Sequence, residues 1–143
     1  MSSPLYSREI LRLAASLAGQ KRLDNPGGTA DLRSPTCGSR VIIDVALNTR
    51  GIVGECGIDA RACALGQASA ALVAAHVTGK SPEELQDAST AMRAFLAGER
   101  GASGIWPGIE VFEPARAYPA RHPSILLAFE AAAQAAHQAQ VAA

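Results

Sequence analysis

Apolar residues recur along this chain with two different periods, and the changes of period divide it into elements. Residues 39–48 predict a strand with an apolar face made by Val41, Ile43, Val45 and Leu47. Residues 48–51 have the composition of a tight turn that ends in glycine, and residues 52–61 return as a second strand. The centre of the chain therefore predicts a β-hairpin.

Four other segments have helical periodicity together with helix start and stop signals. The clearest start is at Ser81, where a serine cap, Pro82 at the first position and Glu84 at the third match a capping box. The predicted helices cover residues 4–18, 64–77, 82–96 and 124–142. Because helices surround a hairpin in the sequence, we expect an α+β fold with the helices on one face of a small antiparallel β-sheet.

Two segments follow neither period. Residues 20–36 are polar and rich in glycine and proline, so they are predicted to be a connector. Residues 98–120 hold four glycines and three prolines, which predicts an irregular insert before the C-terminal helix. A length of 143 residues favours a single domain over residues 1–143.

Composition narrows the classes of function. Thirteen basic and thirteen acidic residues cancel, which argues against nucleic acid or an acidic membrane as the main partner. No apolar run approaches the roughly 20 residues that span a bilayer, and nothing at the N-terminus indicates secretion. Three widely spaced cysteines do not form a disulfide framework. We therefore expect a cytoplasmic protein whose thiols are free or bound to metal.

Three residues at the ends of elements carry the candidate chemistry. Cys63 begins a predicted helix, where the backbone N–H groups and the helix dipole favour a thiolate. Cys37 follows the polar connector and precedes the hairpin, so a ligand could reach it. His122 approaches the last helix and could supply a nitrogen ligand to zinc or iron.

Each of these residues also has a purely structural interpretation. Cys37 and Cys63 could be small buried side chains, as free cysteines often are. His122 could be a loop histidine that is hydrogen-bonded to the backbone. A packing role is favoured for Cys56 in mid-strand and for His76 on a helix, and solvent exposure is favoured for His137.

Several stretches together resemble the iron–sulfur cluster scaffold proteins of the IscU/NifU N-terminal type. They are Pro35-Thr36-Cys37-Gly38, the hairpin, Cys63 followed by Ala-Leu-Gly-Gln-Ala-Ser-Ala, and Gly79-Lys80-Ser81-Pro82-Glu83-Glu84-Leu85. The segment Tyr118-Pro119-Ala120-Arg121, followed after a gap by Ile125-Leu126-Leu127-Ala128, resembles the SufU branch, as does the 98–120 insert. The resemblance covers nearly the whole chain and implies a SufE/NifU-like fold.

The family likeness also implies a ligand set. Members hold zinc or a nascent [2Fe–2S] cluster with three cysteines and an aspartate, and IscU adds a histidine. Cys37 matches the first cysteine and Cys63 the second, but Ser39 stands in the place of the aspartate. The third cysteine position falls on Pro123 or on Ser124, depending on register, and neither residue replaces a thiolate.

The resemblance implies a non-enzymatic scaffold or carrier in iron–sulfur cluster assembly. Its expected metal and cofactor ligands are Cys37, Cys63 and His122, holding a [2Fe–2S] cluster, iron or zinc weakly or transiently. The expected partners are a cysteine desulfurase and cluster-acceptor proteins, and a homo-oligomer could supply the missing ligands. Two alternatives stay open: a degenerate homologue that binds a desulfurase or acceptor without a stable cluster, and a zinc-dependent sulfur-transfer partner.

Overall fold

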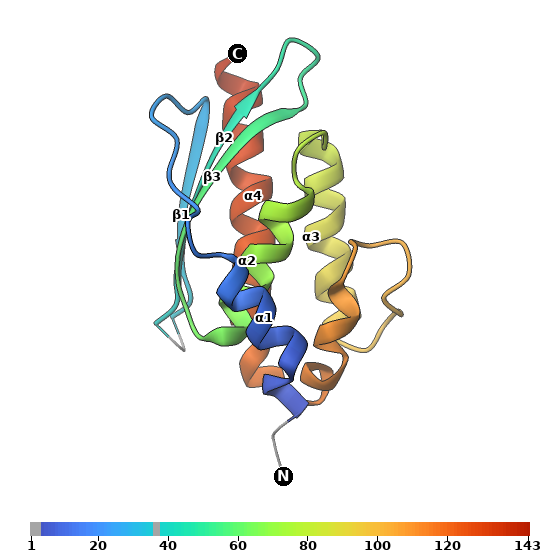
Figure 1. The fold of residues 1–143 in the computed structure, drawn as a ribbon. Helices are drawn as coiled ribbons and strands as arrows, with labels where there is room; N and C mark the ends of the chain where they lie inside the picture. Colours follow the sequence, from blue (N-terminus) through green and yellow to red (C-terminus); the bar gives the residue numbers. More distant parts are fainter. Residues whose placement is uncertain (1–3, 36–37) are drawn as a thin grey trace.

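The computed structural model describes residues 4–35 and 38–143 and contains a three-stranded sheet with helices (Figure 1). The strands are β1 (Gly28–Arg33), β2 (Arg40–Leu47) and β3 (Val53–Arg61). The α-helices are α1 (Arg8–Ser16), α2 (Ala64–His76), α3 (Pro82–Leu96) and α4 (His122–Ala142). Short 3-10 helices are η1 (Pro4–Tyr6), η2 (Ile109–Ala117) and η3 (Pro119–Arg121).

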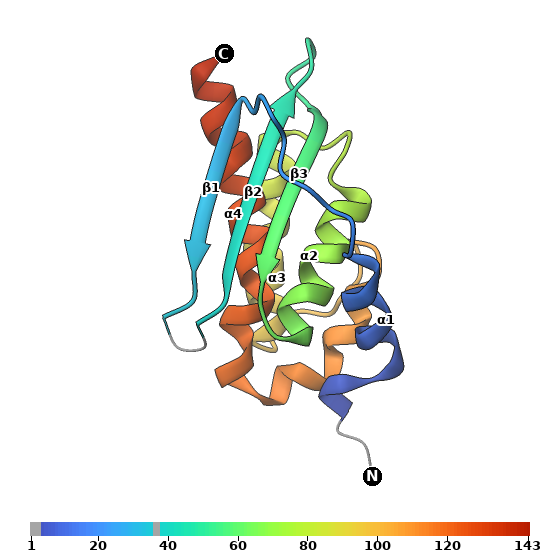
Figure 2. The same cartoon turned by 60° about the vertical axis from the view of Figure 1, so that its left-hand side comes forward.

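The sheet has the order β1-β2-β3 with both pairs antiparallel. In β2, Val41, Ile43 and Val45 are fully buried against the helices, and the residues between them belong to the opposite, outer face of the sheet. Figure 2 shows α2, α3 and α4 behind the sheet and α1 beside its β3 edge. The predicted α+β fold, with helices on one face of a small antiparallel sheet, is confirmed.

Strand β1 corrects the sequence prediction, because residues 28–33 lie inside the segment expected to be a connector. The strand has few apolar residues, and its own pattern is too weak to indicate a strand. It is held in place by β2, with Ala30 opposite Ile43 and Leu32 opposite Val41, and by α4 behind it. Pairing and packing on distant parts of the chain therefore fix this strand.

The connector from α1 to β1 crosses the outer face of the sheet and is fastened by Asp44 (Figure 2). The Asp44 carboxylate is completely buried. It accepts two hydrogen bonds of 3.1 Å from the Arg22 guanidinium, one of 3.0 Å from the Leu23 backbone N–H and one of 2.6 Å from the Thr29 hydroxyl. Directly opposite Asp44 on β3, Gly57 leaves room for the connector, because a Cβ there would lie 2.6 Å from the Leu23 nitrogen.

These bonds predict a loss of stability in acid. Burial alone would raise the pKa of Asp44, but the hydrogen bonds from Arg22, Thr29 and Leu23 outweigh burial and hold the pKa below its usual value of 3.8. Because the folded state binds this proton more weakly than the unfolded chain, the stabilisation is complete above about pH 4 and is lost as the pH falls through the lowered pKa.

Urea unfolding measured from neutral pH to about pH 3 tests this expectation. Asp44→Asn should lower the free energy of unfolding at neutral pH by about 2 kcal/mol and flatten its decline in acid. Asp87→Asn, an exposed position on α3 that accepts no hydrogen bond from the described residues, is the control and should keep the wild-type decline. An unchanged acid decline in Asp44→Asn would contradict the assignment.

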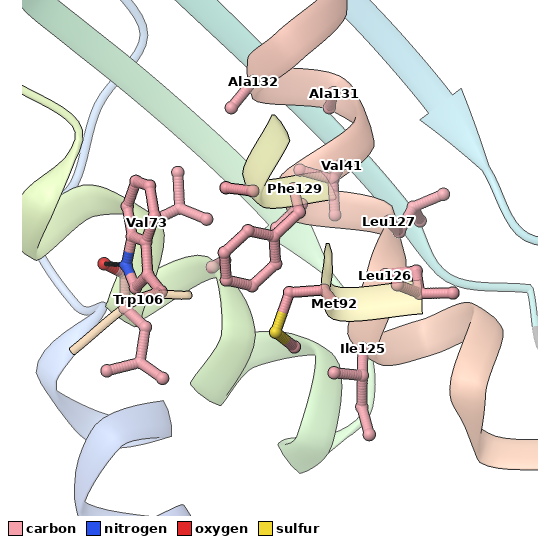
Figure 3. Close-up of a cluster of buried hydrophobic side chains, with 14 of the residues drawn as sticks. Val41, Val73, Met92, Trp106, Ile125, Leu126, Leu127, Phe129, Ala131 and Ala132 are labelled. Carbon is pink, nitrogen blue, oxygen red and sulfur yellow. Dashed lines mark hydrogen bonds between the residues drawn. The ribbon is translucent and has the colours of Figure 1, made fainter. Parts of the chain in front are cut away.

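The core lies between the sheet and the helices and is built around α4. Figure 3 shows the ring of Phe129 pointing from α4 toward Trp106, and the two ring centroids are 5.3 Å apart. The indole N–H of Trp106 donates a 2.8 Å hydrogen bond to the Leu72 carbonyl oxygen on α2. The segment 98–120 is thus tied to the core. It was predicted to be irregular, but it contains η2 and the start of η3.

No helix in the described part of the chain is long and apolar enough to cross a membrane.

Candidate functional site

Three segments that are distant in sequence lie toward the same end of the molecule. They are the loop between β1 and β2, the N-terminus of α2 and the N-terminus of α4 (Figures 1 and 2). All three had been singled out by the sequence for cysteine or histidine residues. The fold therefore places Cys63, His122 and the residues that flank Cys37 toward a common end.

Cys63 is the N-cap residue of α2, with extended backbone angles of φ −64° and ψ 172°. Its carbonyl oxygen accepts the first helical hydrogen bond, 2.9 Å from the Gln67 nitrogen. The side chain is half-buried and makes no capping hydrogen bond, so the thiol does not cap the start of the helix.

Cys37 lies outside the described residues, but both sides of its loop are described. The loop is closed by a 2.9 Å hydrogen bond from the Ser34 nitrogen to the Ser39 oxygen. A second bond, of 3.2 Å, runs from the Gly38 nitrogen to the Ser34 oxygen. Gly38 has a φ of 72°, in the left-handed region that favours glycine. The positions that flank the expected ligand are therefore fixed at the end of a hairpin.

Two buried serines border this end of the molecule. Ser39 and Ser124 are each only 2% exposed. Ser124 packs against Gly66, one turn along α2 from Cys63, where a Cβ would lie 3.3 Å from the Ser124 carbonyl oxygen and 3.9 Å from its Cβ. One residue further, the Ile125 carbonyl oxygen accepts a 2.6 Å hydrogen bond from the Ser69 hydroxyl. These contacts hold the start of α4 against the start of α2.

His122 is the first residue of α4, and its ring is tied to η2. The Nε2 atom lies 3.0 Å from the Ala115 carbonyl oxygen, so Nε2 carries the proton and donates the bond. In the neutral ring this leaves Nδ1 with a free lone pair. Among residues 4–35 and 38–143, no three histidine, cysteine, aspartate or glutamate side chains come together in a group that could hold a metal ion. The assignment of His122 as a ligand stays a prediction.

Cys56 has an environment that does not suit a ligand. It lies on β3, on the face that packs against the helices, opposite Val45. Burial, with a smaller effect from the Asp44 carboxylate, raises the pKa of the thiol to about 12. A thiol with this pKa stays protonated at neutral pH, which agrees with the packing role expected for Cys56.

The two other histidines also match the sequence interpretation. His76 is half-buried at the end of α2, with its ring centroid 6.4 Å from that of Trp106. His137 is exposed on α4. Sequence reasoning left the role of Ser124 undecided. Only the close approach of two helices, which no local pattern records, shows that this serine packs against Gly66, one helical turn from Cys63.

Comparison with known proteins places the chain in a family. No family model and no curated protein matches it. A crystal structure of a nitrogen-fixing NifU-like protein (N-terminal) from Brucella abortus is 34% identical, with a TM-score of 0.90 over 99% of this chain and 98% of that one. The shared fold and sequence thus define an α+β protein of the NifU type. The chain belongs to the NifU-like (N-terminal) family, which confirms the resemblance noted in the sequence.

Two more distant structures share the fold. A putative iron–sulfur cluster assembly scaffold protein for the SUF system from Fervidobacterium islandicum is 18% identical, with a TM-score of 0.86 over 95% of this chain and 99% of that one. A hypothetical protein is 20% identical, with a TM-score of 0.70 over 90% of this chain and 96% of that one.

Proposed function

We propose that this protein is a scaffold or carrier in iron–sulfur cluster assembly. The observation that supports this most directly is the half-buried thiol of Cys63 at the start of α2, at the same end as the β1–β2 loop and the start of α4. It occurs in a chain that is 34% identical to a NifU-like protein over 99% of its length. The SUF-system structure with the same fold is itself described as a putative cluster assembly scaffold.

The small number of candidate ligands favours a metal ion or cluster that is bound weakly and can be released. Cys37 and Cys63 supply two thiolates, and Nδ1 of His122 keeps a free lone pair in the tautomer that the bond to the Ala115 carbonyl oxygen requires. Closed structural zinc sites use four ligands, and [2Fe–2S] clusters take four thiolates or two thiolates and two imidazoles. Iron, zinc or a cluster bound here therefore keeps open positions, which suits a cargo that is passed on.

Ser124, and not Pro123, is the residue that we place at the third cysteine position. This register is supported by the packing of Ser124 against Gly66, beside Cys63, and by its burial. The same register aligns the Pro119-Ala120-Arg121 segment with the SufU branch. It leaves the site with hydroxyl groups at two ligand positions, Ser39 and Ser124.

The partners we propose are a cysteine desulfurase, which supplies sulfur, and proteins that accept the cluster. A second candidate function follows from the two buried serines. A chain with neutral hydroxyls in place of an aspartate and a thiolate keeps the fold and its docking surfaces but not a strong metal site. Such a chain would act as a desulfurase- or acceptor-binding module.

Anaerobic reconstitution with ferrous iron, sulfide and a cysteine desulfurase tests the scaffold proposal. The wild type is expected to gain thiolate-to-iron absorption, and Cys63→Ser is expected to lose most of it. Cys56→Ser is the matched control. This thiol lies on β3, the strand that leads to Cys63, but it packs against the core.

Two results would decide against metal carriage. One is the absence of iron and zinc from anaerobically prepared wild type. The other is an equal metal content in Cys63→Ser. If a pull-down of the desulfurase then persists in a Cys37→Ser/Cys63→Ser double variant, the binding-module function is the one that remains.

A further inference from the structure

Three arginines lie side by side across the sheet at the same end as Cys63. In the strand register Arg33 is opposite Arg40, and Arg40 is opposite Arg61. Residues directly opposite in antiparallel strands share a face. Since Val41 points to the helices, this arginine row (Arg33, Arg40 and Arg61) lies on the outer face. The connector that covers this face is anchored further along the strands, at Asp44 (Figure 2).

The arginine row is partly compensated by two neighbouring carboxylates. Like charges directly opposite each other on neighbouring strands repel. Asp31 binds Arg40 with two bonds of 2.9 and 2.6 Å, and Asp59 lies 3.8 Å from Arg61. Arg33 is exposed and makes no ion pair or hydrogen bond through its side chain with the described residues. The side chain of Arg61 is 73% exposed.

The row places like charges on neighbouring strands, and its two outer members, Arg33 and Arg61, keep exposed guanidinium groups, so it is a candidate surface for another molecule. We propose that the arginine row docks an acidic helix of a partner protein. The guanidinium groups of Arg33 and Arg61 are available to carboxylates, which arginine binds through two parallel N–H···O bonds. The partner is therefore recognised by aspartate or glutamate side chains that it presents in a line.

The spacing of the row fits a helix that crosses the strands. Neighbouring strands lie about 4.8 Å apart, so three opposed positions span about 10 Å. A helix rises about 1.5 Å per residue, so acidic residues at i, i+4 and i+7 are spaced at about 6 and 10 Å along one side. A helix placed across β1, β2 and β3 could therefore set carboxylates at i and i+7 near Arg33 and Arg61, on either side of the Arg40–Asp31 ion pair.

The position of the arginine row would bring a bound partner close to the candidate metal site. A partner seated on the arginine row lies at the end of the molecule that holds Cys63 and the β1–β2 loop (Figure 1). The formal charge of the whole chain is zero, so the row is a local feature and does not make the protein a general polyanion binder. Binding of the acidic helix needs no metal, and its test is independent of the scaffold proposal.

Fluorescence anisotropy at low ionic strength, with metal-free protein, tests the docking surface. The probe is a fluorescein-labelled peptide with glutamate along one helical face, and a peptide with glutamine at the same positions is its control. Arg33→Glu should weaken binding of the acidic peptide about fivefold, and Arg33→Gln/Arg61→Gln, with the same change in net charge, by a similar factor.

The matched control is Arg50→Glu. Arg50 is an exposed arginine in the turn between β2 and β3, at the opposite end of the same sheet, and its exchange changes the net charge equally. This variant should leave the Kd for the acidic peptide unchanged. Thermal unfolding of all variants verifies that they are folded.

Five results would overturn the proposal. The first four are no binding of the acidic peptide to wild type, equal binding of the glutamine peptide, an equal loss in Arg50→Glu, and binding of single-stranded DNA that is tighter than that of the acidic peptide and is abolished by Arg33→Glu. Self-association of the wild type that Arg33→Glu removes would also overturn it, because the occupant would then be a second copy of this chain.

Discussion

Ser124→Cys is expected to raise the affinity for zinc by at least about tenfold, because it adds a thiolate where the site has a hydroxyl. Ser124 packs against Gly66, one helical turn from Cys63, so the new sulfur would enter the same end of the molecule. Serine and cysteine have nearly the same shape, and a buried free cysteine is well tolerated, so the exchange should cost little stability. Competition with a chromophoric chelator measures the change in affinity.

Two controls test whether the gain in zinc affinity depends on the position of the new thiol or follows from any added thiol. Ser89→Cys adds a thiol at another buried serine, on α3, and should leave the zinc affinity unchanged. In the Ser124→Cys background, Cys63→Ser should remove the gain, because the two sulfurs are expected to hold the same ion. A gain of equal size in Ser89→Cys, or one that survives Cys63→Ser, would show that Ser124 is not at a ligand position.

The elements that could be predicted from sequence are those that are determined by residues close together in the chain. The start of α3 is an example: the Glu84 nitrogen donates to the Ser81 hydroxyl at 3.1 Å, and the Ser81 nitrogen donates to the Glu84 carboxylate at 3.0 Å. Both halves of this capping box lie within four residues. The β2–β3 hairpin was predictable for the same reason, since its strands and turn are contiguous.

Features built from distant residues could not be predicted in this way. Strand β1 is set by its pairing with β2 and by α4, which begins nearly ninety positions after β1 ends. The buried Asp44 looked like an ordinary polar residue of a strand, but it fastens the connector that carries Arg22. In the site, the position of Cys63 followed from a local helix start, whereas our proposal of Ser124 over Pro123 rests on the packing of α4 on α2.

Gly28→Ala is expected to lower the free energy of unfolding by about 3 kcal/mol, because there is no space for a methyl group at this position. A Cβ on Gly28 would lie 2.6 Å from the Ala139 nitrogen and closer still to the Ala135 carbonyl oxygen. Both atoms belong to the backbone of α4, so no side chain can rotate away. Relief requires β1 to move away from the helix, which would weaken its pairing with β2. Urea unfolding of the variant and the wild type measures the loss.

The matched control is Gly101→Ala, in the segment between α3 and η2. A Cβ at Gly101 meets nothing within 4 Å, and this glycine does not have a positive φ. Its exchange should change the stability by less than about 0.5 kcal/mol. An equal loss in both variants would show that steric contact with α4 is not the cause. Because β1 leads into the loop that carries Cys37, a displaced β1 should also reduce reconstituted iron at temperatures where Gly28→Ala is still folded, and Gly101→Ala should not.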